Sequence, residues 1–143
     1  MLVPLQLRWY LKMHEFNFFG DGVVFDHVGM VVASLDEVAS DVPSTVDEIQ
    51  KVCVAFVDLH GIRTELIEPL NVDSPVQSSL KEGRPLAHLC FGVPDLNVAL
   101  AYGRENGFHQ IGQPRPAPAF DNRLIAWVFS RTYGLFELVE NRE

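Results

Sequence analysis

Apolar and polar residues alternate over short stretches along most of the chain, a pattern that is typical of half-buried strands. Runs rich in β-branched and aromatic residues predict strands at 23–32, 51–58, 62–68, 85–93, 108–113, 124–130 and 134–139. Two stretches between these runs begin with residues that are typical of helix N-caps, and they are predicted to be helices. Ser34 is the expected N-cap of the first, with Glu37 three residues later, and Asp95 caps a helix over 96–106 that Gly107 ends.

Proline marks two of the connecting stretches. Residues 69–81 are expected to connect two strands, with one helical turn after Ser74-Pro75. Residues 115–120, RPAPAF, are expected to form an extended loop. Neither stretch is therefore assigned a strand.

The chain carries one pattern of residues twice. DHVGMVVASLDEVA at 26–39 aligns with AHLCFGVPDLNVAL at 87–100, and GIRTELIE at 61–68 aligns with YGLFELVE at 133–140. His27 thereby falls on His88, and Glu65 falls on Glu137. Each half supplies one histidine on an early strand and one glutamate on a late strand, as expected for a duplicated module.

This alignment predicts one α+β domain over residues 23–143, built from two β-α-β-β-β modules at about 23–70 and 85–140. The interval from the histidine to the glutamate is 38 positions in the first module and 49 in the second. The missing positions fall before Lys51. The first module is therefore expected to have a stunted helix and a fragmentary second strand.

Residues 1–22 match neither module and are interpreted as an N-terminal extension. Its aromatic residues are Trp9, Tyr10, Phe16, Phe18 and Phe19. Because so many aromatic side chains are not left in water, we expect the extension to pack on the domain or on a partner chain.

Strand alternation places each of these histidines and glutamates opposite a set of apolar or small residues, as on a sheet with helices behind it and a cleft in front. Taken singly, a histidine on a strand is more often a hydrogen-bonded core residue, and a glutamate is usually solvated. Two of each at matching positions are explained better by one metal site, because a carboxylate pair in a cleft is costly unless a cation neutralises it. We therefore predict that His27, Glu65, His88 and Glu137 hold one divalent ion, and these ligand types suit Zn²⁺, Co²⁺, Ni²⁺, Mn²⁺ or Fe²⁺.

The net charge and the cysteine content limit the kinds of binding partner and the cellular location that we expect. A net charge of −8 argues against nucleic acid and against an anionic membrane, but it permits a small anionic substrate held by a few cations. Cys53 and Cys90 each lie in an apolar run and are expected to be free thiols. No stretch approaches the about 18–20 apolar residues of a membrane span, and the start of the chain lacks the features of a signal peptide. We therefore expect a cytoplasmic protein with a small-molecule substrate.

Four stretches carry a resemblance to a known family: FDHVGMVV, IQKVCVAFVDLHGIRTELIEPLNVDSP, LAHLCFGVPDL and PAPAFDNRLIAWVFSRTYGLFELVE. They resemble the vicinal oxygen chelate superfamily, the group of glyoxalase I, methylmalonyl-CoA epimerase and extradiol dioxygenases, over about residues 24–140. ELIEPLNVDSP followed by a histidine strand is most similar to the acyl-CoA epimerase branch. The resemblance implies a U-shaped, partly open, barrel-like mixed sheet with helices outside, and a divalent metal held by the same four residues. Members of this superfamily pair their modules within one chain or across a dimer. The apolar extension and the strand edges left exposed by the short module lead us to expect a homodimer.

The first module departs from the epimerase pattern. Glu65 stands where the epimerases typically have glutamine, so the ligand set is closer to that of glyoxalase I. The catalytic glutamate of the epimerases precedes the glutamine of an E-Q-G-V stretch, and the matching position here is Ile49, followed by Gln50. The neighbouring Glu48 would point to the other face of a strand. One of the two bases that an epimerase needs is therefore expected to be absent, and the short module removes part of one cleft wall.

Three functions stay open at this point. The first is a metal-dependent lyase or isomerase of the glyoxalase or epimerase type, which acts on a small carbonyl or acyl-thioester substrate through an enolate-like intermediate, with Glu137 and Glu65 as candidate bases. The alternative is a non-catalytic protein that binds a small molecule, as antibiotic-sequestering members do. The third is an inactive, dimer-forming relative. In each case Trp127, Phe129 and Phe120 are expected either to line the cleft or to be ordinary core.

Overall fold

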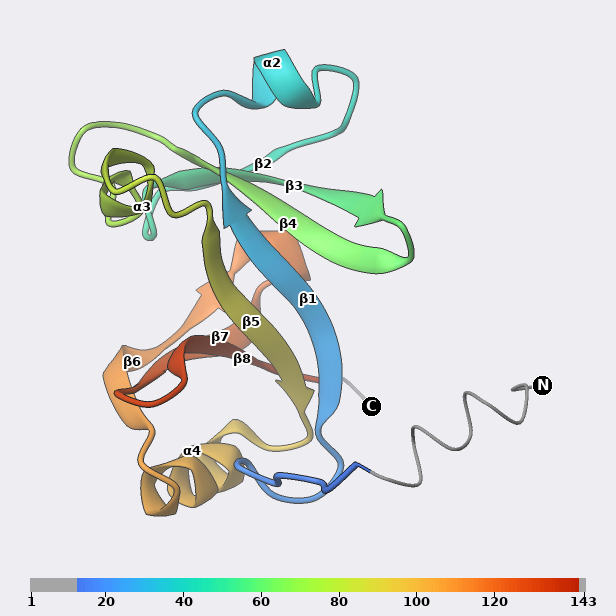
Figure 1. Cartoon of the computed structure of the whole chain (residues 1–143), viewed down its shortest axis with the longest axis vertical. Coiled ribbons are helices and arrows are strands. Elements are labelled where there is room, and N and C mark those ends of the chain that lie inside the picture. The colour runs from blue at the N-terminus through green and yellow to red at the C-terminus, as the bar shows by residue number, and fades with distance from the viewer. Residues whose placement is uncertain (1–12, 142–143) are drawn as a thin grey trace.

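The computed structural model of the chain describes residues 13–141, and its strands form one mixed sheet (Figure 1). The strands are β1 (Val24–Val31), β2 (Thr45–Asp47), β3 (Val52–Leu59), β4 (Ile62–Pro69), β5 (Leu86–Val93), β6 (His109–Ala117), β7 (Arg123–Ser130) and β8 (Gly134–Glu140). The helices are α2 (Leu35–Val38), α3 (Gln77–Lys81), α4 (Leu96–Glu105) and the 3-10 helix η1 (Pro118–Phe120). The fold is α+β, as the sequence predicts.

The two modules meet at the centre of the sheet, whose order is β2-β3-β4-β1-β5-β8-β7-β6. β1 and β5, the first strands of the two modules, pair antiparallel. β1 runs parallel to β4, and β5 runs parallel to β8. Each module thus pairs its first strand with its last, and the sheet curls into the U shape that the resemblance implies (Figure 1).

The first module is the shorter one, as predicted. Its helix α2 has 4 residues against 10 in α4, and its strand β2 has 3 residues against 9 in β6. The predicted caps are present in both modules. The Ser34 hydroxyl accepts a hydrogen bond from the Glu37 amide, and the Asp95 carboxylate accepts one from the Val98 amide.

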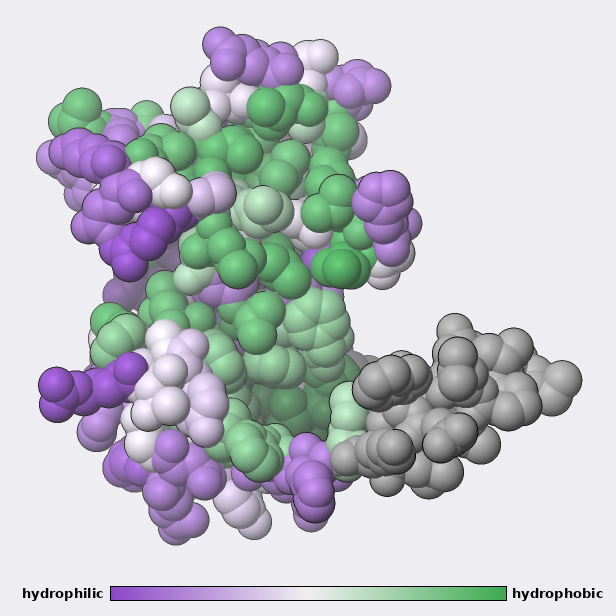
Figure 2. Space-filling model, in the orientation of Figure 1, coloured by the Kyte–Doolittle hydropathy of each residue, from purple (hydrophilic) through white to green (hydrophobic). Residues whose placement is uncertain are grey.

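The outer face of the first strand is only partly covered. Val28 and Met30 alternate with His27 and are expected to pack under a helix, but they are half-buried because α2 is a single turn. Phe25 on β1 is 50% exposed, and Leu86 on the neighbouring strand β5 is 64% exposed. Figure 2 shows apolar residues along the middle of the molecule, where β1 and β5 run in Figure 1.

The prediction of a loop at residues 115–120 is wrong. β6 continues through Ala117, and Arg115 to Ala117 pair with β7 after a register shift that follows Ile111. Pro114 and Pro116 lack the amide hydrogen of a central strand, but β6 lies at the edge of the sheet, where one side of the strand needs no partner. The remaining residues of the predicted loop form η1.

The main core lies between α4 and the outer face of the second module. Phe19, Phe108 and Leu138 belong to this cluster and are at most 4% exposed. Within the predicted extension, Phe18 packs on this cluster beside Phe19, whereas Phe16 is 69% exposed. Trp9 and Tyr10 lie outside the described residues. The described end of the extension therefore packs on its own domain.

The cysteines and the lengths of the helices agree with what the sequence predicts, within the residues that the structure describes. Cys53 and Cys90 are both free cysteines, and Cys90 is buried. Between residues 13 and 141, the structure contains no helix with the length and apolar character needed to cross a membrane.

Candidate metal centre

The four predicted ligands stand on the four central strands of the sheet. His27 lies on β1, Glu65 on β4, His88 on β5 and Glu137 on β8. Strand register brings them level, since Gly29 of β1 is opposite both Glu65 and His88. All four face the inside of the curl, because Phe136 and Leu138, which alternate with Glu137, belong to the core on the other face.

The tips of these four side chains converge on one point. Their nearest ligand atoms all lie within 4.8 Å of one another. The two histidine Nε2 atoms are 3.4 Å apart, and Oε1 of Glu137 lies 3.3 Å and 3.4 Å from them. Oε1 of Glu65 lies 3.6 Å and 3.7 Å from the same two nitrogens. Ligand atoms held tetrahedrally about 2.0–2.2 Å from an ion are about 3.3–3.6 Å apart, so the spacing fits a bound metal ion.

The burial of the cluster also fits a metal ion. The four residues are between 0% and 5% exposed. Oε1 of Glu137 is buried and makes no hydrogen bond. An unpaired buried carboxylate oxygen is costly, and a cation between the four groups would satisfy it. Two imidazole nitrogens and two carboxylates are also a donor set that divalent transition metals accept.

His27 is oriented from behind by a carboxylate that the sequence analysis did not single out. Its Nδ1–H donates a hydrogen bond of 2.7 Å to Asp26, which also accepts one of 2.6 Å from the Arg63 guanidinium. A proton fixed on Nδ1 leaves Nε2 free to face the cluster. Asp26 precedes His27 directly, so strict alternation would place it on the opposite face. The register of β1 against β5 shifts between Phe25 and His27, which lets both side chains meet.

The charged forms of His27 and Glu137 stabilise each other in this cluster. Burial alone would lower the pKa of His27, but the hydrogen bond to Asp26 and the neighbouring carboxylates raise it well above its ordinary value. Burial alone would raise the pKa of Glu137, but the two adjacent imidazoles lower it. Without metal, His27 thus keeps a second ring proton, which faces the carboxylates of the cluster. A metal ion would replace this proton, because imidazole binds metals only through a free nitrogen.

The Asp26→Asn variant is expected to bind a divalent metal about 10- to 100-fold more weakly, the usual loss when an outer partner of a ligating histidine is removed. The amide keeps the shape of the carboxylate but loses its charge and is a weaker acceptor for Nδ1–H. Competition with a chromophoric chelator measures the affinity. Asp36→Asn, at an exposed position on α2, is the control and should bind as the parent does. Parental affinity in Asp26→Asn would show that Asp26 does not orient His27.

His88 is held between two other residues. A Cβ on Gly29 would lie 2.1 Å from Cε1 of His88, so the imidazole rests directly on the backbone of β1. On the other side, the ring of Trp127 meets the His88 ring nearly edge-on, with 4.8 Å between the ring centroids. The orientation of this ligand therefore depends on a glycine and an indole, and the sequence analysis assigned a role to neither contact.

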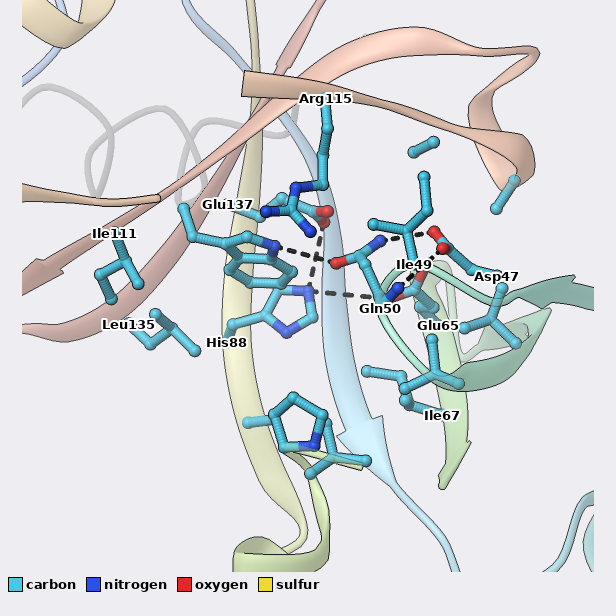
Figure 3. Close-up of a pocket in the computed structure, with 18 of the residues that line it drawn as sticks. Asp47, Ile49, Gln50, Glu65, Ile67, His88, Ile111, Arg115, Leu135 and Glu137 are labelled. Carbon is cyan, nitrogen blue, oxygen red and sulfur yellow. Dashed lines mark hydrogen bonds and ion pairs between the residues drawn. The ribbon is translucent and has the colours of Figure 1, made fainter. Parts of the chain in front are cut away.

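The cluster opens into a cavity of about 470 Å³ that both modules line (Figure 3). Trp127 and Phe120 line this cavity, as one of the two expectations had it, while Phe129 is 43% exposed and does not. Most of the wall is apolar. Ile49, which the resemblance aligns with the catalytic glutamate of the epimerases, is part of it. Among the described lining residues, Arg115 is the one arginine or lysine, and its side chain points into the cavity (Figure 3).

Comparison with known proteins finds one matching family. The sequence profile of the Glyoxalase/Bleomycin resistance protein/Dioxygenase superfamily matches residues 24–127. An uncharacterized protein of Bacillus subtilis (strain 168), YqjC, is 40% identical over 77 residues, which are 46% of this chain and 54% of that protein. The mitochondrial methylmalonyl-CoA epimerase of Bos taurus is 39% identical over 51 residues, 34% of this chain and 29% of that protein. The matches thus span about half, and less than a third, of these curated relatives.

Several solved structures share the fold. The hypothetical protein BH1468 from Bacillus halodurans C-125 has a TM-score of 0.72 at 24% identity, covering 86% of this chain and 97% of its own. Methylmalonyl-CoA epimerase from Mycobacterium tuberculosis also has a TM-score of 0.72, at 22% identity, with 92% and 95% covered. A variant of the Streptomyces coelicolor methylmalonyl-CoA epimerase, in complex with 2-nitronate-propionyl-CoA, has a TM-score of 0.68 at 25% identity, with 82% and 94% covered.

Proposed function

The chain belongs to the Glyoxalase/Bleomycin resistance protein/Dioxygenase superfamily, and from that premise we propose that it is a metal-dependent lyase or isomerase acting on a small carbonyl or acyl-thioester compound. The observation that carries this proposal is the convergence of His27, Glu65, His88 and Glu137 within 4.8 Å. The acyl-thioester option is supported by the Streptomyces coelicolor relative, whose ligand is an acyl-CoA analogue.

The proposed reaction begins with removal of a proton from the carbon beside a carbonyl group. A divalent ion held by the four residues would supply Lewis-acid stabilisation of the negative charge that develops on the carbonyl oxygen. Glu65 and Glu137 are the candidate bases, since both line the cavity.

The cavity wall favours chemistry with a single base. Ile49 supplies no proton acceptor where the epimerases have their second base, and the carboxylate of Asp47 is already hydrogen-bonded to Gln50. One carboxylate would therefore take the proton from the carbon and then give it back, either to the same carbon or to a neighbouring atom of the enolate-like intermediate. The guanidinium of Arg115 makes no ion pair within 4 Å among residues 13–141 and is placed to contact an anionic group of the substrate.

Proton–deuterium exchange tests this proposal without knowledge of the product. Protein loaded with Zn²⁺, Co²⁺, Ni²⁺, Mn²⁺ or Fe²⁺ is incubated in D₂O with candidate hemithioacetals, small carbonyl acids and acyl-CoA thioesters. Mass spectrometry should detect deuterium on the carbon beside the carbonyl of at least one compound, and chelation of the metal should stop the incorporation. The matched control is the metal alone at the same concentration. Absence of exchange over a broad panel contradicts the proposal.

The non-catalytic alternative has one observation in its favour, the apolar residue Ile49 at the position of a base. A protein of that kind would bind a small molecule in the same cavity with no exchange into it. Tight binding without deuterium incorporation therefore selects this alternative. The homodimer and the cytoplasmic location also stay predictions, and the half-covered apolar residues on β1 and β5 support the homodimer.

A further inference from the structure

A chain of hydrogen bonds crosses the cavity from one module to the other. Asp47, at the end of β2, accepts hydrogen bonds from the backbone amide of Gln50 at 2.9 Å and from its side-chain Nε2 at 2.7 Å (Figure 3). The side-chain oxygen of Gln50 accepts a bond of 2.9 Å from the indole N–H of Trp127 on β7. Asp47 is 3% exposed, so this end of the chain of bonds is anchored in the interior.

The orientation of the Gln50 amide follows from its partners. A carboxylate can only accept and an indole N–H can only donate, so the amide nitrogen must face Asp47 and the amide oxygen must face Trp127. Every polar atom in the chain of bonds then has a partner of the right kind. Gln50 and Trp127 are half-buried, so loss of either end would leave a half-buried donor or acceptor without its protein partner.

These bonds join parts of the sheet that are far apart in strand order. Gln50 follows β2, the strand at one end of the sheet, and Trp127 lies on β7, next to the other end. The curl of the sheet brings the two ends face to face. The bond between Gln50 and Trp127 therefore links the two ends of the sheet across the cavity.

Trp127 in turn touches the cluster. Its ring meets the imidazole of His88 at 4.8 Å between centroids, and it is paired across the strands with Glu137. An indole that is free to rock would no longer restrain the imidazole, whose other face rests on Gly29. The path from Asp47 through Gln50 and Trp127 thus ends at two of the four candidate ligands.

We infer that Gln50 is a positioning residue of the metal centre, which holds the Trp127 ring against His88 through a hydrogen bond that links the two modules. This inference rests on the proposed function, since it concerns the same site. The residue does not touch the reacting atoms in this role. It acts by restricting the directions from which His88 can approach a metal ion, so its loss changes the ligand geometry as well as the affinity.

Titration of the full chain with Co²⁺ tests the inference, because the visible absorption of Co²⁺ depends on ligand geometry. Gln50→Ala removes the acceptor, and Trp127→Phe keeps an aromatic ring beside His88 but removes the donor. Each single variant should bind Co²⁺ about three- to tenfold more weakly and shift the absorption bands, a smaller loss than that of a direct partner of a ligand. The double variant should be no worse than either single one, since both remove the same bond.

Gln110→Ala is the matched control, because Gln110 lies exposed on β6 and its side chain bonds only the Gly112 carbonyl among the described contacts. Parental affinity and spectrum in Gln50→Ala overturn the inference. So does a loss in Gln50→Ala that Trp127→Phe does not share. If Gln50→Ala does not fold, the Trp127→Phe spectrum decides. A parent chain that binds no Co²⁺ overturns the proposed function itself and this inference with it, which separates the two failures.

Discussion

Replacement of His88 by alanine is expected to lower the affinity for divalent metal by more than about 100-fold and to reduce metal-dependent deuterium exchange to the background rate. Loss of an outer-shell partner already costs about 10- to 100-fold, and His88 contributes a ligand atom directly. The variant leaves one imidazole to balance two buried carboxylates. Metal analysis of protein purified without chelator, followed by chelator competition, measures the loss.

His109→Ala is the control for this experiment, since His109 is exposed at the start of β6 and lies outside the cluster. It should bind metal as the parent does. Circular dichroism of both variants shows whether the fold is kept. Metal retained at the parental level in His88→Ala would place the ion somewhere other than between the four strands.

The Gly29→Ala variant is expected to lose metal affinity about tenfold or more and to become less stable by about 1–3 kcal/mol, the usual cost of overpacking. The new Cβ would lie 2.1 Å from Cε1 and 2.4 Å from Nδ1 of His88, so the imidazole has to leave its place. The backbone of Gly29 does not have a positive φ, so the effect comes from this contact and not from strain. Chelator competition and urea unfolding measure the two quantities.

Gly92→Ala is the matched control on β5. Its new Cβ would meet the tip of the Asn141 side chain at 2.6 Å, and a flexible amide can turn away where a packed imidazole cannot. We expect this variant to keep the parental metal affinity. Equal affinities in Gly29→Ala and the parent would mean that the contact with the backbone of β1 does not set the position of His88.

The convergence of the four side chains could be predicted from the sequence because a repeat fixes register. Once His27 is aligned with His88, and Glu65 with Glu137, strand alternation alone decides that all four share a face. The same alignment predicts where the first module is short, and α2 and β2 are short there. The same strand and helix signals occur in both modules, so each module supports the assignment of the other. The structure confirms both the convergence of the four side chains and the short first module.

The residues around the cluster could not be predicted in this way. Asp26 reaches His27 through a register shift in β1, and strict alternation hides such a shift. Gln50 and Trp127 are 77 positions apart, and only the curl of the sheet brings them together. The strand at 115–117 was hidden by its prolines, which are tolerated because the sheet ends there. Each of these features depends on tertiary contacts that no local pattern contains.

The antiparallel pairing of β1 with β5 has the geometry of an isologous contact folded into one polypeptide. A twofold axis through such a contact doubles whatever each side contributes. Two copies of the second module, paired through β5, would therefore supply two histidines and two glutamates, the same four ligand types. Neither half has to be complete by itself. The first half is pared down to a single helical turn and a three-residue edge strand, yet it still delivers its own pair of donors.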